Sequence, residues 1–360
     1  MLIPLAQADE RCGAKAVGLA RLMRAGFAVP PGFVVPDVRQ AGWTSDIGPA
    51  LDRLGAGPFA VRSSAPEEDG HETSFAGQHR TVLGVVTHAG VVREVVRVAG
   101  SAREPAAVAY AARSGRTPAA VIPVVVQVQV PARVAGVLFT RHPVTGAHQV
   151  VVEAAAGLGE QVVGGTTTPQ AWTVDDDGTT SAPAVGQPVL TPAEVRELVA
   201  IGRRVEAAAG CAQDVEWAIA GDTVWVLQAR PVTALPTGRA RAGAPQGDVL
   251  ATGTPGSPGR ASGVARVVRG LDELHRFGAG EVLVCRTTTP AWTPLLARAA
   301  AVVTETGGML AHAAIVAREF GIPAVLAADG ATAALPDGAH VVVDGTDGTV
   351  ALTADRGGLR

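Results

Sequence analysis

A stretch rich in proline, glycine and arginine, LPTGRARAGAPQGD, interrupts the chain past its middle and shows no apolar periodicity. Such a stretch is typical of a linker, because nothing in it can anchor a helix or strand to a core. The regions on either side both carry strong local signals. We therefore predict two domains, over residues 1–235 and 249–360, joined by a linker at residues 236–248.

The second region contains short β-type runs and one clear helix. GVARVV, EVLVCR, AAVVTE, PAVLA and HVVVDG recur at fairly regular spacing, as strands do in a small sheet. Between the third and fourth runs, apolar positions at helical spacing predict a helix over residues 311–320. Gly321 supplies its end and Pro323 follows. This region is expected to be a small domain of strands with few helices.

The first region is mixed. Helices are predicted over residues 15–25 and 192–209, and strands at PFAVRS, TVLGV, AVIPVVVQVQV, AGVLFT and HQVVVEA. The run VEWAIAGDTVWVLQ predicts a hairpin whose turn is Gly221 and Asp222, since two alternating strands flank this pair. The expected fold class is therefore α+β with much antiparallel sheet.

Composition excludes several classes of protein. The net charge of −3 gives no reason to expect nucleic acid or an anionic membrane as a partner. The start, MLIPLAQADERCGAK, lacks a signal-peptide pattern, and no apolar run approaches the roughly 18 residues of a membrane span. Three cysteines without CxxC spacing argue against a disulfide framework or a zinc site. We expect a cytoplasmic protein.

Lysine is almost absent from the chain. Lys15 is the only lysine among 30 basic residues, and the rest are arginine. Together with heavy use of Ala, Gly and Val, this indicates a high-GC bacterial genome, in which arginine readily replaces lysine. The remaining lysine either sits where a compact ammonium group is required or survives by chance on a surface. Composition alone leaves both interpretations open.

The string TETGGMLAHAAIVAREFGIPAV, residues 304–325, places a histidine at a helix start. Gly307 and Gly308 lead into the predicted helix, whose first turn presents His312. Free backbone N–H groups and the helix dipole favour an anion there. A histidine in that place could take a phosphoryl group on a ring nitrogen. The alternative is an ordinary capping or surface histidine.

This string closely resembles the phosphohistidine swivelling domain of the family of phosphoenolpyruvate synthase, pyruvate phosphate dikinase and rifampicin phosphotransferase. GSPGRASGVARV, TTTPAWTPLL and DGAHVVVDGTDGTV extend the resemblance to both ends of the domain. The resemblance implies a small β/β/α domain in which His312 is phosphorylated during turnover. Ala311 departs from the family, which often has a small hydroxyl residue or cysteine there.

The first region resembles the ATP-grasp-type nucleotide-binding domain of the same family. The motifs are AKAVGLARLMRAGFAVPPGFVV, FAVRSSAPEEDGHETSFAGQHRTVL, GVLFTRHPVTG and VVEAAAGLGEQVVGGTTTPQ. By this resemblance, some residues of these motifs bind the phosphates of ATP and others lie near the rest of the nucleotide. The VVVQ segment would hold the adenine. The residues so implicated in ATP binding are Lys15, Arg62, Gly77, Thr81, Gln127, Glu153 and Arg230. An arginine fork suits phosphate because it donates two parallel hydrogen bonds.

The run QDVEWAIAGDTVWVLQARPVT suggests a metal site. On a hairpin, Glu216 and Gln228 can face the same side of adjacent strands, and two oxygen ligands suit Mg²⁺. Arg230, two residues further along, points to the same face. The resemblance assigns Glu216 and Gln228 to the metal and Arg230 to the phosphates. The alternative is a surface ion pair between Glu216 and Arg230.

Two gaps set this chain apart from its relatives. The segment between VPPGF and FAVRSS is short, and no acceptor domain is recognisable. We expect a minimal dikinase-type phosphotransferase that uses ATP and Mg²⁺ and passes the β-phosphoryl group of ATP through His312 to a small-molecule acceptor, such as a natural product or antibiotic. The alternatives are a phosphoryl relay to a separate acceptor protein and a non-catalytic ATP-binding regulator.

Overall fold

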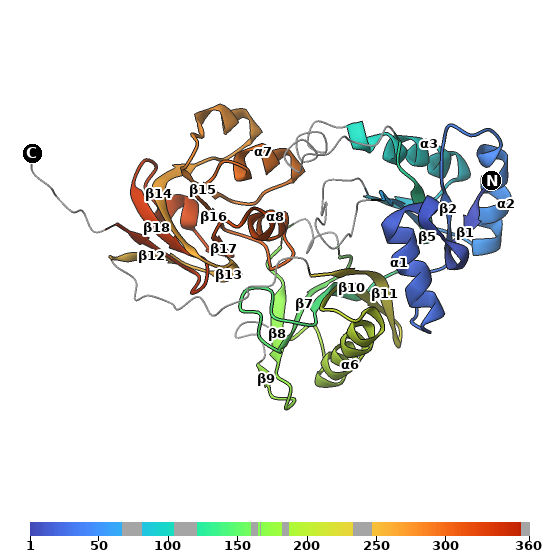
Figure 1. Cartoon of the computed structure of the whole chain (residues 1–360), viewed down its shortest axis with the longest axis horizontal. Helices are drawn as coiled ribbons and strands as arrows, with labels where there is room; N and C mark the ends of the chain where they lie inside the picture. Colours follow the sequence, from blue (N-terminus) through green and yellow to red (C-terminus); the bar gives the residue numbers. More distant parts are fainter. Residues whose placement is uncertain are drawn as a thin grey trace, which may run out of the picture. The chain divides into compact units, whose positions relative to one another are not determined.

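The computed structural model describes residues 1–66, 81–103, 121–159, 165, 167–181, 187–232 and 247–353. The chain forms two compact units. Unit 1 comprises residues 1–140, 156–159 and 189–233, and unit 2 comprises residues 141–155, 160–188 and 234–360. Figure 1 shows the helices and strands of both units, coloured along the chain.

Unit 1 contains a five-stranded sheet whose pairs are all antiparallel, in the order β1-β2-β5-β3-β4. Its strands are β1 (Ile3–Pro4), β2 (Gly32–Val35), β3 (Phe59–Ser63), β4 (Thr81–Val85) and β5 (Val124–Val128). The accompanying helices are η1 (Leu5–Gln7), η2 (Glu10–Cys12), α1 (Gly13–Arg24), α2 (Trp43–Leu54), α3 (His88–Ala99) and η3 (Ser101–Arg103).

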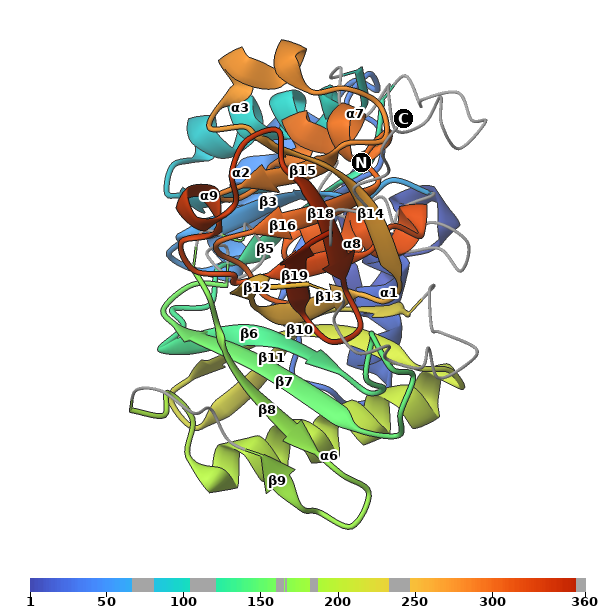
Figure 2. The same cartoon turned by 90° about the vertical axis from the view of Figure 1, so that its left-hand side faces the viewer.

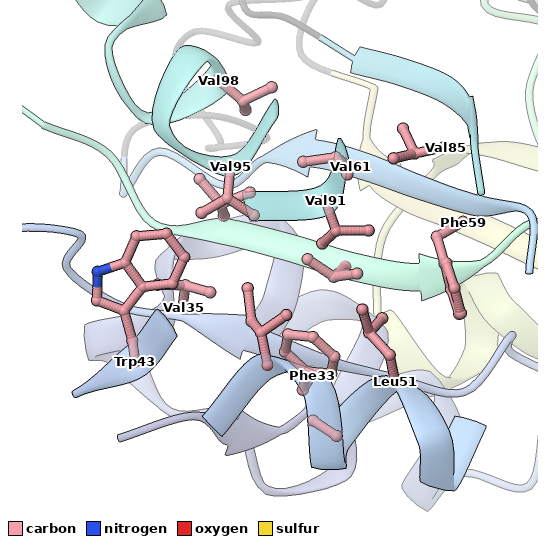
Figure 3. Close-up of a cluster of buried hydrophobic side chains, with 14 of the residues drawn as sticks. Phe33, Val35, Trp43, Leu51, Phe59, Val61, Val85, Val91, Val95 and Val98 are labelled. Atoms are coloured by element: carbon pink, nitrogen blue, oxygen red, sulfur yellow. The ribbon is translucent and has the colours of Figure 1, made fainter. Parts of the chain in front are cut away.

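The core of this sheet forms against α2 and α3. Val91, Val95 and Val98 recur at helical spacing on α3, so they line one face of that helix. Trp43 and Leu51 come from α2, and Figure 3 shows these side chains converging with those of β2 and β3. All five are buried, so the apolar face of each helix is removed from water.

A second antiparallel group in unit 1 has the strand order β11-β10-β6. Its elements are β6 (Val134–Phe139), β10 (Gln213–Ala220), β11 (Thr223–Pro231) and the helix α6 (Pro192–Ala209), which packs on β6 and β10 (Figure 2). The Thr191 hydroxyl accepts from the Glu194 backbone N–H, and the Glu194 carboxylate accepts from Thr191 in return. The helix spans the predicted residues 192–209, and this capping box and left-handed Gly210 bound it.

Unit 2 contains two groups of strands. One has the order β7-β8-β9, and the other has the order β12-β19-β18-β14-β15-β16-β17-β13. Its strands are β7 (Val150–Ala156), β8 (Gln170–Val174), β9 (Thr180–Ser181), β12 (Val249–Thr252), β13 (Thr254–Ser257), β14 (Arg260–Val267), β15 (Val282–Cys285), β16 (Ala301–Thr304), β17 (Ala324–Leu326), β18 (His340–Asp344) and β19 (Thr349–Leu352). Its helices are η4 (Leu271–Arg276), η5 (Pro290–Trp292), α7 (Thr293–Leu296), α8 (His312–Phe320) and α9 (Ala331–Ala334).

The strands β14, β15, β16 and β17 are parallel neighbours, and α8 packs on β13, β16 and β17. Figure 1 shows α8 lying beside these strands. Ala313, Ala314 and Ala317 are fully buried, so their small side chains let the helix approach the sheet closely. The structure confirms the helix predicted over residues 311–320, which begins one residue later and ends at left-handed Gly321.

The two units do not coincide with the domains predicted from the sequence, because residues 141–155 and 160–188 group with the C-terminal part. The ranges 1–235 and 249–360 therefore stay a prediction, and most of the predicted linker lies outside the described residues. Within the described part of the chain, no helix combines the length and apolar character that a membrane span requires.

Candidate functional site

The hairpin of β10 and β11 carries four of the polar side chains at the candidate site. Its turn is Gly221 and Asp222, as predicted. Glu216 lies opposite Gln228 in the register, and Asp214 lies opposite Arg230. Residues that face each other across antiparallel strands project on the same side of the sheet. The hairpin therefore gathers two carboxylates, an amide and a guanidinium on one face.

A β-bulge lies beside this cluster. Glu216 pairs with Gln228, but the next residue, Trp217, pairs with Val226, so Leu227 has no partner in the register. A bulged residue is released from the hydrogen-bond ladder and re-aims the side chains next to it. The carbonyl oxygen of Leu227 accepts a hydrogen bond from Arg62 Nη1 at 2.7 Å. The irregularity thus supplies an acceptor that regular pairing would have used.

Arg62 on β3 reaches both predicted metal ligands. Its Nη2 donates to Glu216 Oε2 at 3.1 Å and to Gln228 Oε1 at 2.8 Å. The side chains of Arg62 and Glu216 are 11% and 20% exposed, so the ion pair is largely shielded from water. The alternative that paired Glu216 with Arg230 is wrong. Local spacing could not reveal the true partner of Glu216, because Arg62 lies 154 residues away in the sequence.

Arg230 is held by a residue that sequence reasoning missed. Its Nε donates to Asp214 Oδ2 at 2.9 Å, its Nη2 forms an ion pair with the same oxygen at 2.8 Å, and both side chains are under a tenth exposed. The signal was present, because Asp214 stands two residues before Glu216 and strand residues two apart share a face. A buried guanidinium needs such a carboxylate, since an unpaired buried charge is strongly unfavourable.

Lys15 is buried rather than exposed on a surface. It lies in the first turn of α1, is 5% exposed, and its Nζ donates to the Ser63 carbonyl oxygen at 3.1 Å. Ser63 directly follows Arg62 on β3. The start of α1 presses against the next residue, because a Cβ on Gly13 would lie 1.6 Å from the Ser64 carbonyl oxygen. Only glycine permits this approach, and it brings the lone lysine next to Arg62.

The remaining predicted residues of unit 1 lie on neighbouring strands. Thr81 begins β4 opposite Arg62, and its side chain is exposed. Gln127 on β5 is 3% exposed, and its Nε2 donates to the Pro30 carbonyl oxygen at 2.9 Å. Gly77 lies outside the described residues. The structure therefore brings Lys15 and Arg62 together with the hairpin, with Thr81 on the adjoining strand.

Glu153 belongs to unit 2 and contacts the turn that precedes His312. Its side chain is 1% exposed, and Oε1 accepts a hydrogen bond from the Met309 backbone N–H at 2.8 Å. A Cβ on Gly308 would lie within 2.6 Å of both carboxylate oxygens, so the second glycine of the motif makes room for this contact. A place for Glu153 beside the nucleotide stays a prediction.

His312 is the first residue of α8 and is 5% exposed. Its Nδ1 lies 2.9 Å from the Thr288 hydroxyl, and its Nε2 lies 3.2 Å from the Thr293 hydroxyl. Thr293 already donates its only hydroxyl hydrogen to the Pro290 carbonyl oxygen at 2.8 Å. It must therefore accept from Nε2–H, which leaves the lone pair on Nδ1 to accept from Thr288. Both threonines lie within the TTTPAWTPLL motif, although sequence reasoning gave them no role.

Burial keeps this imidazole neutral. Desolvation disfavours the charged form and lowers the pKa of His312 to about 3. At neutral pH the ring therefore holds one proton and one lone pair. That is the state required of a nitrogen nucleophile.

An arginine on the same helix secures the turn before the histidine. Arg318 Nη1 donates to the Gly256 carbonyl oxygen at 2.8 Å, and Nη2 donates to the Met309 carbonyl oxygen at 2.7 Å. One guanidinium thus ties the glycine turn to β13. The threonines at 287 and 306 also donate to one acceptor, the Gly165 carbonyl oxygen, at 3.0 and 2.7 Å.

The donor set of the hairpin suits a hard divalent cation. Glu216 and Gln228 present oxygens that converge on one point, as their shared contact with Arg62 Nη2 demonstrates. Carboxylate and amide oxygens are the ligands that Mg²⁺ prefers. Within the described ranges, no group of three His, Cys, Asp or Glu side chains could hold a metal ion. An ion at this hairpin would thus share its shell with substrate or water.

Two protein families match this chain. The model of "Pyruvate phosphate dikinase, AMP/ATP-binding domain" matches residues 41–186 and 177–246. The model of "PEP-utilising enzyme, mobile domain" matches residues 277–348, which include His312. Among solved structures, the D-alanine–D-alanine ligase from Bacillus anthracis covers 61% of this chain and 56% of its own, at 12% identity and a TM-score of 0.33.

Several curated relatives are named phosphoenolpyruvate synthase. A probable phosphoenolpyruvate synthase from Archaeoglobus fulgidus is 39% identical over 81% of this chain, and one from Methanothermobacter thermautotrophicus is 37% identical over 81%. The phosphoenolpyruvate synthase from Aeropyrum pernix is 32% identical over 94%. The chain spans 43%, 46% and 56% of the lengths of these relatives, in that order.

Proposed function

Because the chain belongs to the family of the pyruvate phosphate dikinase AMP/ATP-binding domain, we propose that it is an ATP-dependent phosphotransferase acting through phosphohistidine at His312. Its fold class is α+β, with an ATP-grasp-type nucleotide-binding domain followed by a β/β/α domain of the swivelling, phosphohistidine type. The observation that carries the proposal is the buried, neutral ring of His312, whose proton Thr293 fixes on Nε2.

In the proposed first step, a ring nitrogen of His312 attacks the β-phosphorus of ATP. The bond from that phosphorus to the oxygen bridging the α-phosphorus breaks, and AMP leaves with the oxygen. The γ-phosphoryl group then passes to water and leaves as phosphate, so the β-phosphoryl group stays on the ring. Because a P–N bond on imidazole is high in energy, onward transfer to a hydroxyl or nitrogen is thermodynamically feasible.

The cations of unit 1 support the nucleotide half of this proposal. Lys15, Arg62 and Arg230 would bind the phosphates, for which a guanidinium fork is well suited. Glu216 and Gln228 would hold Mg²⁺, which when bound neutralises charge on the triphosphate. Asp214 orients Arg230, since one of its carboxylate oxygens accepts from Nε and pairs with Nη2.

The other nucleotide contacts follow from the family. Thr81, Gln127 and Glu153 are proposed to place the nucleotide, and Gly77 is proposed to contribute to ATP binding. Gln127 supports this proposal because it is buried and its hydrogen bond to the Pro30 carbonyl oxygen fixes its amide. Glu153 is buried and accepts a hydrogen bond from the Met309 backbone N–H.

The acceptor is proposed to be a small molecule. The relatives are named phosphoenolpyruvate synthases, so pyruvate is the first acceptor to test. A natural product or antibiotic with a free hydroxyl or nitrogen is the second. Transfer from labelled protein to each compound, followed by chromatography, distinguishes the two.

Position-specific label tests the phosphohistidine. Incubation with β-labelled ATP should leave acid-labile, base-stable label on the protein, and γ-labelled ATP should leave none after turnover. His312→Ala should abolish the label and retain ATP binding. His340→Ala is the matched control, because this exposed histidine of the same unit should not affect labelling. Label that persists on the His312→Ala protein would show that another residue is the nucleophile.

A further inference from the structure

Arg62 occupies the point where a metal ion would bridge the two oxygen ligands. Its Nη2 is within hydrogen-bond distance of both Glu216 Oε2 and Gln228 Oε1, at 3.1 and 2.8 Å. Its Nη1 is fixed on the Leu227 carbonyl oxygen, which the bulge makes available. The guanidinium therefore places a positive charge between the two side chains that would hold the metal ion.

A metal ion and this guanidinium cannot occupy the place together. Mg²⁺ binds oxygen at roughly 2.0–2.1 Å, so an ion shared by both side chains would lie almost in contact with Nη2. Two cations at such a distance repel strongly in a partly buried site. We infer that Arg62 closes the metal site of the nucleotide-free protein, and that the triphosphate opens it by drawing the guanidinium away. The inference rests on the proposed role of Glu216 and Gln228 as metal ligands.

The contacts of Arg62 allow this exchange. Among the described residues, Glu216 is its ionic partner, whereas Gln228 and the Leu227 carbonyl are neutral acceptors. A phosphate group offers the guanidinium two parallel, charge-assisted hydrogen bonds and replaces that one ion pair. Once Arg62 has turned to the phosphate, Glu216 has an uncompensated charge, which a metal ion then satisfies. Free metal should therefore bind weakly, and the metal–nucleotide complex should bind as a unit.

Metal binding to the nucleotide-free protein tests the inference. Mn²⁺ is the probe, because it accepts the same oxygen ligands and its free form is counted by electron paramagnetic resonance. Arg62→Ala should tighten Mn²⁺ binding at least tenfold relative to wild type. Arg133→Ala is the matched control, since it also removes an arginine from a carboxylate of unit 1, Glu194, whose other oxygen accepts hydrogen bonds from Thr191. Its Mn²⁺ affinity should equal that of wild type.

Two further variants locate the effect. Arg62→Ala combined with Glu216→Gln should lose the gain, because the ion then lacks its carboxylate. Arg62→Lys serves if the alanine variant fails to fold. An ammonium group lacks the fork that makes these three contacts together, so this variant should bind Mn²⁺ with an affinity between those of wild type and Arg62→Ala.

The outcomes separate this inference from the proposed function. Unchanged Mn²⁺ affinity in both Arg62 variants, or a gain that survives Glu216→Gln, overturns the closing role of Arg62. If β-label still appears on His312 in wild type, that result leaves the phosphotransferase proposal intact. Conversely, tighter Mn²⁺ binding without any label on His312 supports the closing role and refutes the phosphohistidine.

Discussion

Acidification should destabilise the wild-type protein more than a His312→Asn variant. The pKa of His312 is lowered by burial from 6.5 in an unperturbed ring to about 3 in the folded protein. Between these values the unfolded chain binds a proton that the folded chain excludes. The contribution of the neutral His312 ring to the free energy of unfolding is therefore fully present above pH 6.5. It is lost as the pH falls from 6.5 towards 3.

The size of the effect follows from the same window. One excluded proton changes the free energy of unfolding by about 1.4 kcal/mol per pH unit. The unfolded ring is half protonated at pH 6.5, so the loss between pH 6.5 and pH 5 comes to about 1.7 kcal/mol. Solvent screening removes little of it, because the side chain is only 5% exposed.

Urea unfolding of both proteins at the two pH values measures this loss. Subtracting the change in the His312→Asn protein removes the contribution of all other titrating groups, since they are common to both. Nuclear magnetic resonance of ¹⁵N-labelled imidazole should also show a single proton on Nε2 of His312 down to pH 5. An equal loss in the two proteins, or a ring that titrates above pH 5, would refute the neutral buried state.

Three substitutions test other parts of the site. Lys15→Arg replaces a compact, buried ammonium with a planar fork and should slow turnover by on the order of tenfold, measured as AMP release; full activity would make the lone lysine an accident of composition. Asp214→Ala leaves Arg230 without its carboxylate and should lower the free energy of unfolding by about 3–5 kcal/mol in urea. The control, Asp37→Ala, breaks a surface ion pair with Arg39 and should leave the free energy of unfolding nearly unchanged. Equal losses in the Asp214→Ala and Asp37→Ala proteins would contradict a buried Asp214–Arg230 pair. Gly308→Ala places a Cβ 2.6 Å from Pro169 Cγ and should destabilise by about 1–3 kcal/mol, whereas an unchanged melting temperature would show that the turn relaxes freely.

Local signals explain which elements the sequence predicts well. The helix α6 is bounded by a capping box at Thr191 and by Gly210, so both ends are encoded within the segment itself. The hairpin turn and α8 have equally local markers. By contrast, α2 and α3 lie outside the predicted elements. The first has Pro49 within it, and the second is rich in valine, so neither shows an ordinary helical composition.

Contacts between distant segments explain what the sequence does not reveal. Spacing from the turn alone would pair Glu216 with Leu227, and only the bulge brings Gln228 opposite Glu216. Spacing also gives no sign that Arg62 fills the place between them, since that contact spans 154 residues and depends on the bulge at Leu227. The same limit hides the threonines that fix the tautomer of His312. The roles of these residues in binding and catalysis stay predictions.

The charges of unit 1 determine how the site can receive a triphosphate. Lys15, Arg62 and Arg230 contribute three positive charges, and Asp214 and Glu216 contribute two negative ones, which leaves one net positive charge. Each of the three cations already has a protein oxygen as partner. Under the proposed function, binding of ATP would therefore exchange the partners of these cations rather than fill vacant positive sites. Because each exchange releases a carboxylate or carbonyl oxygen, a polyanion alone should bind less well than one that brings a metal ion to occupy the oxygens it releases.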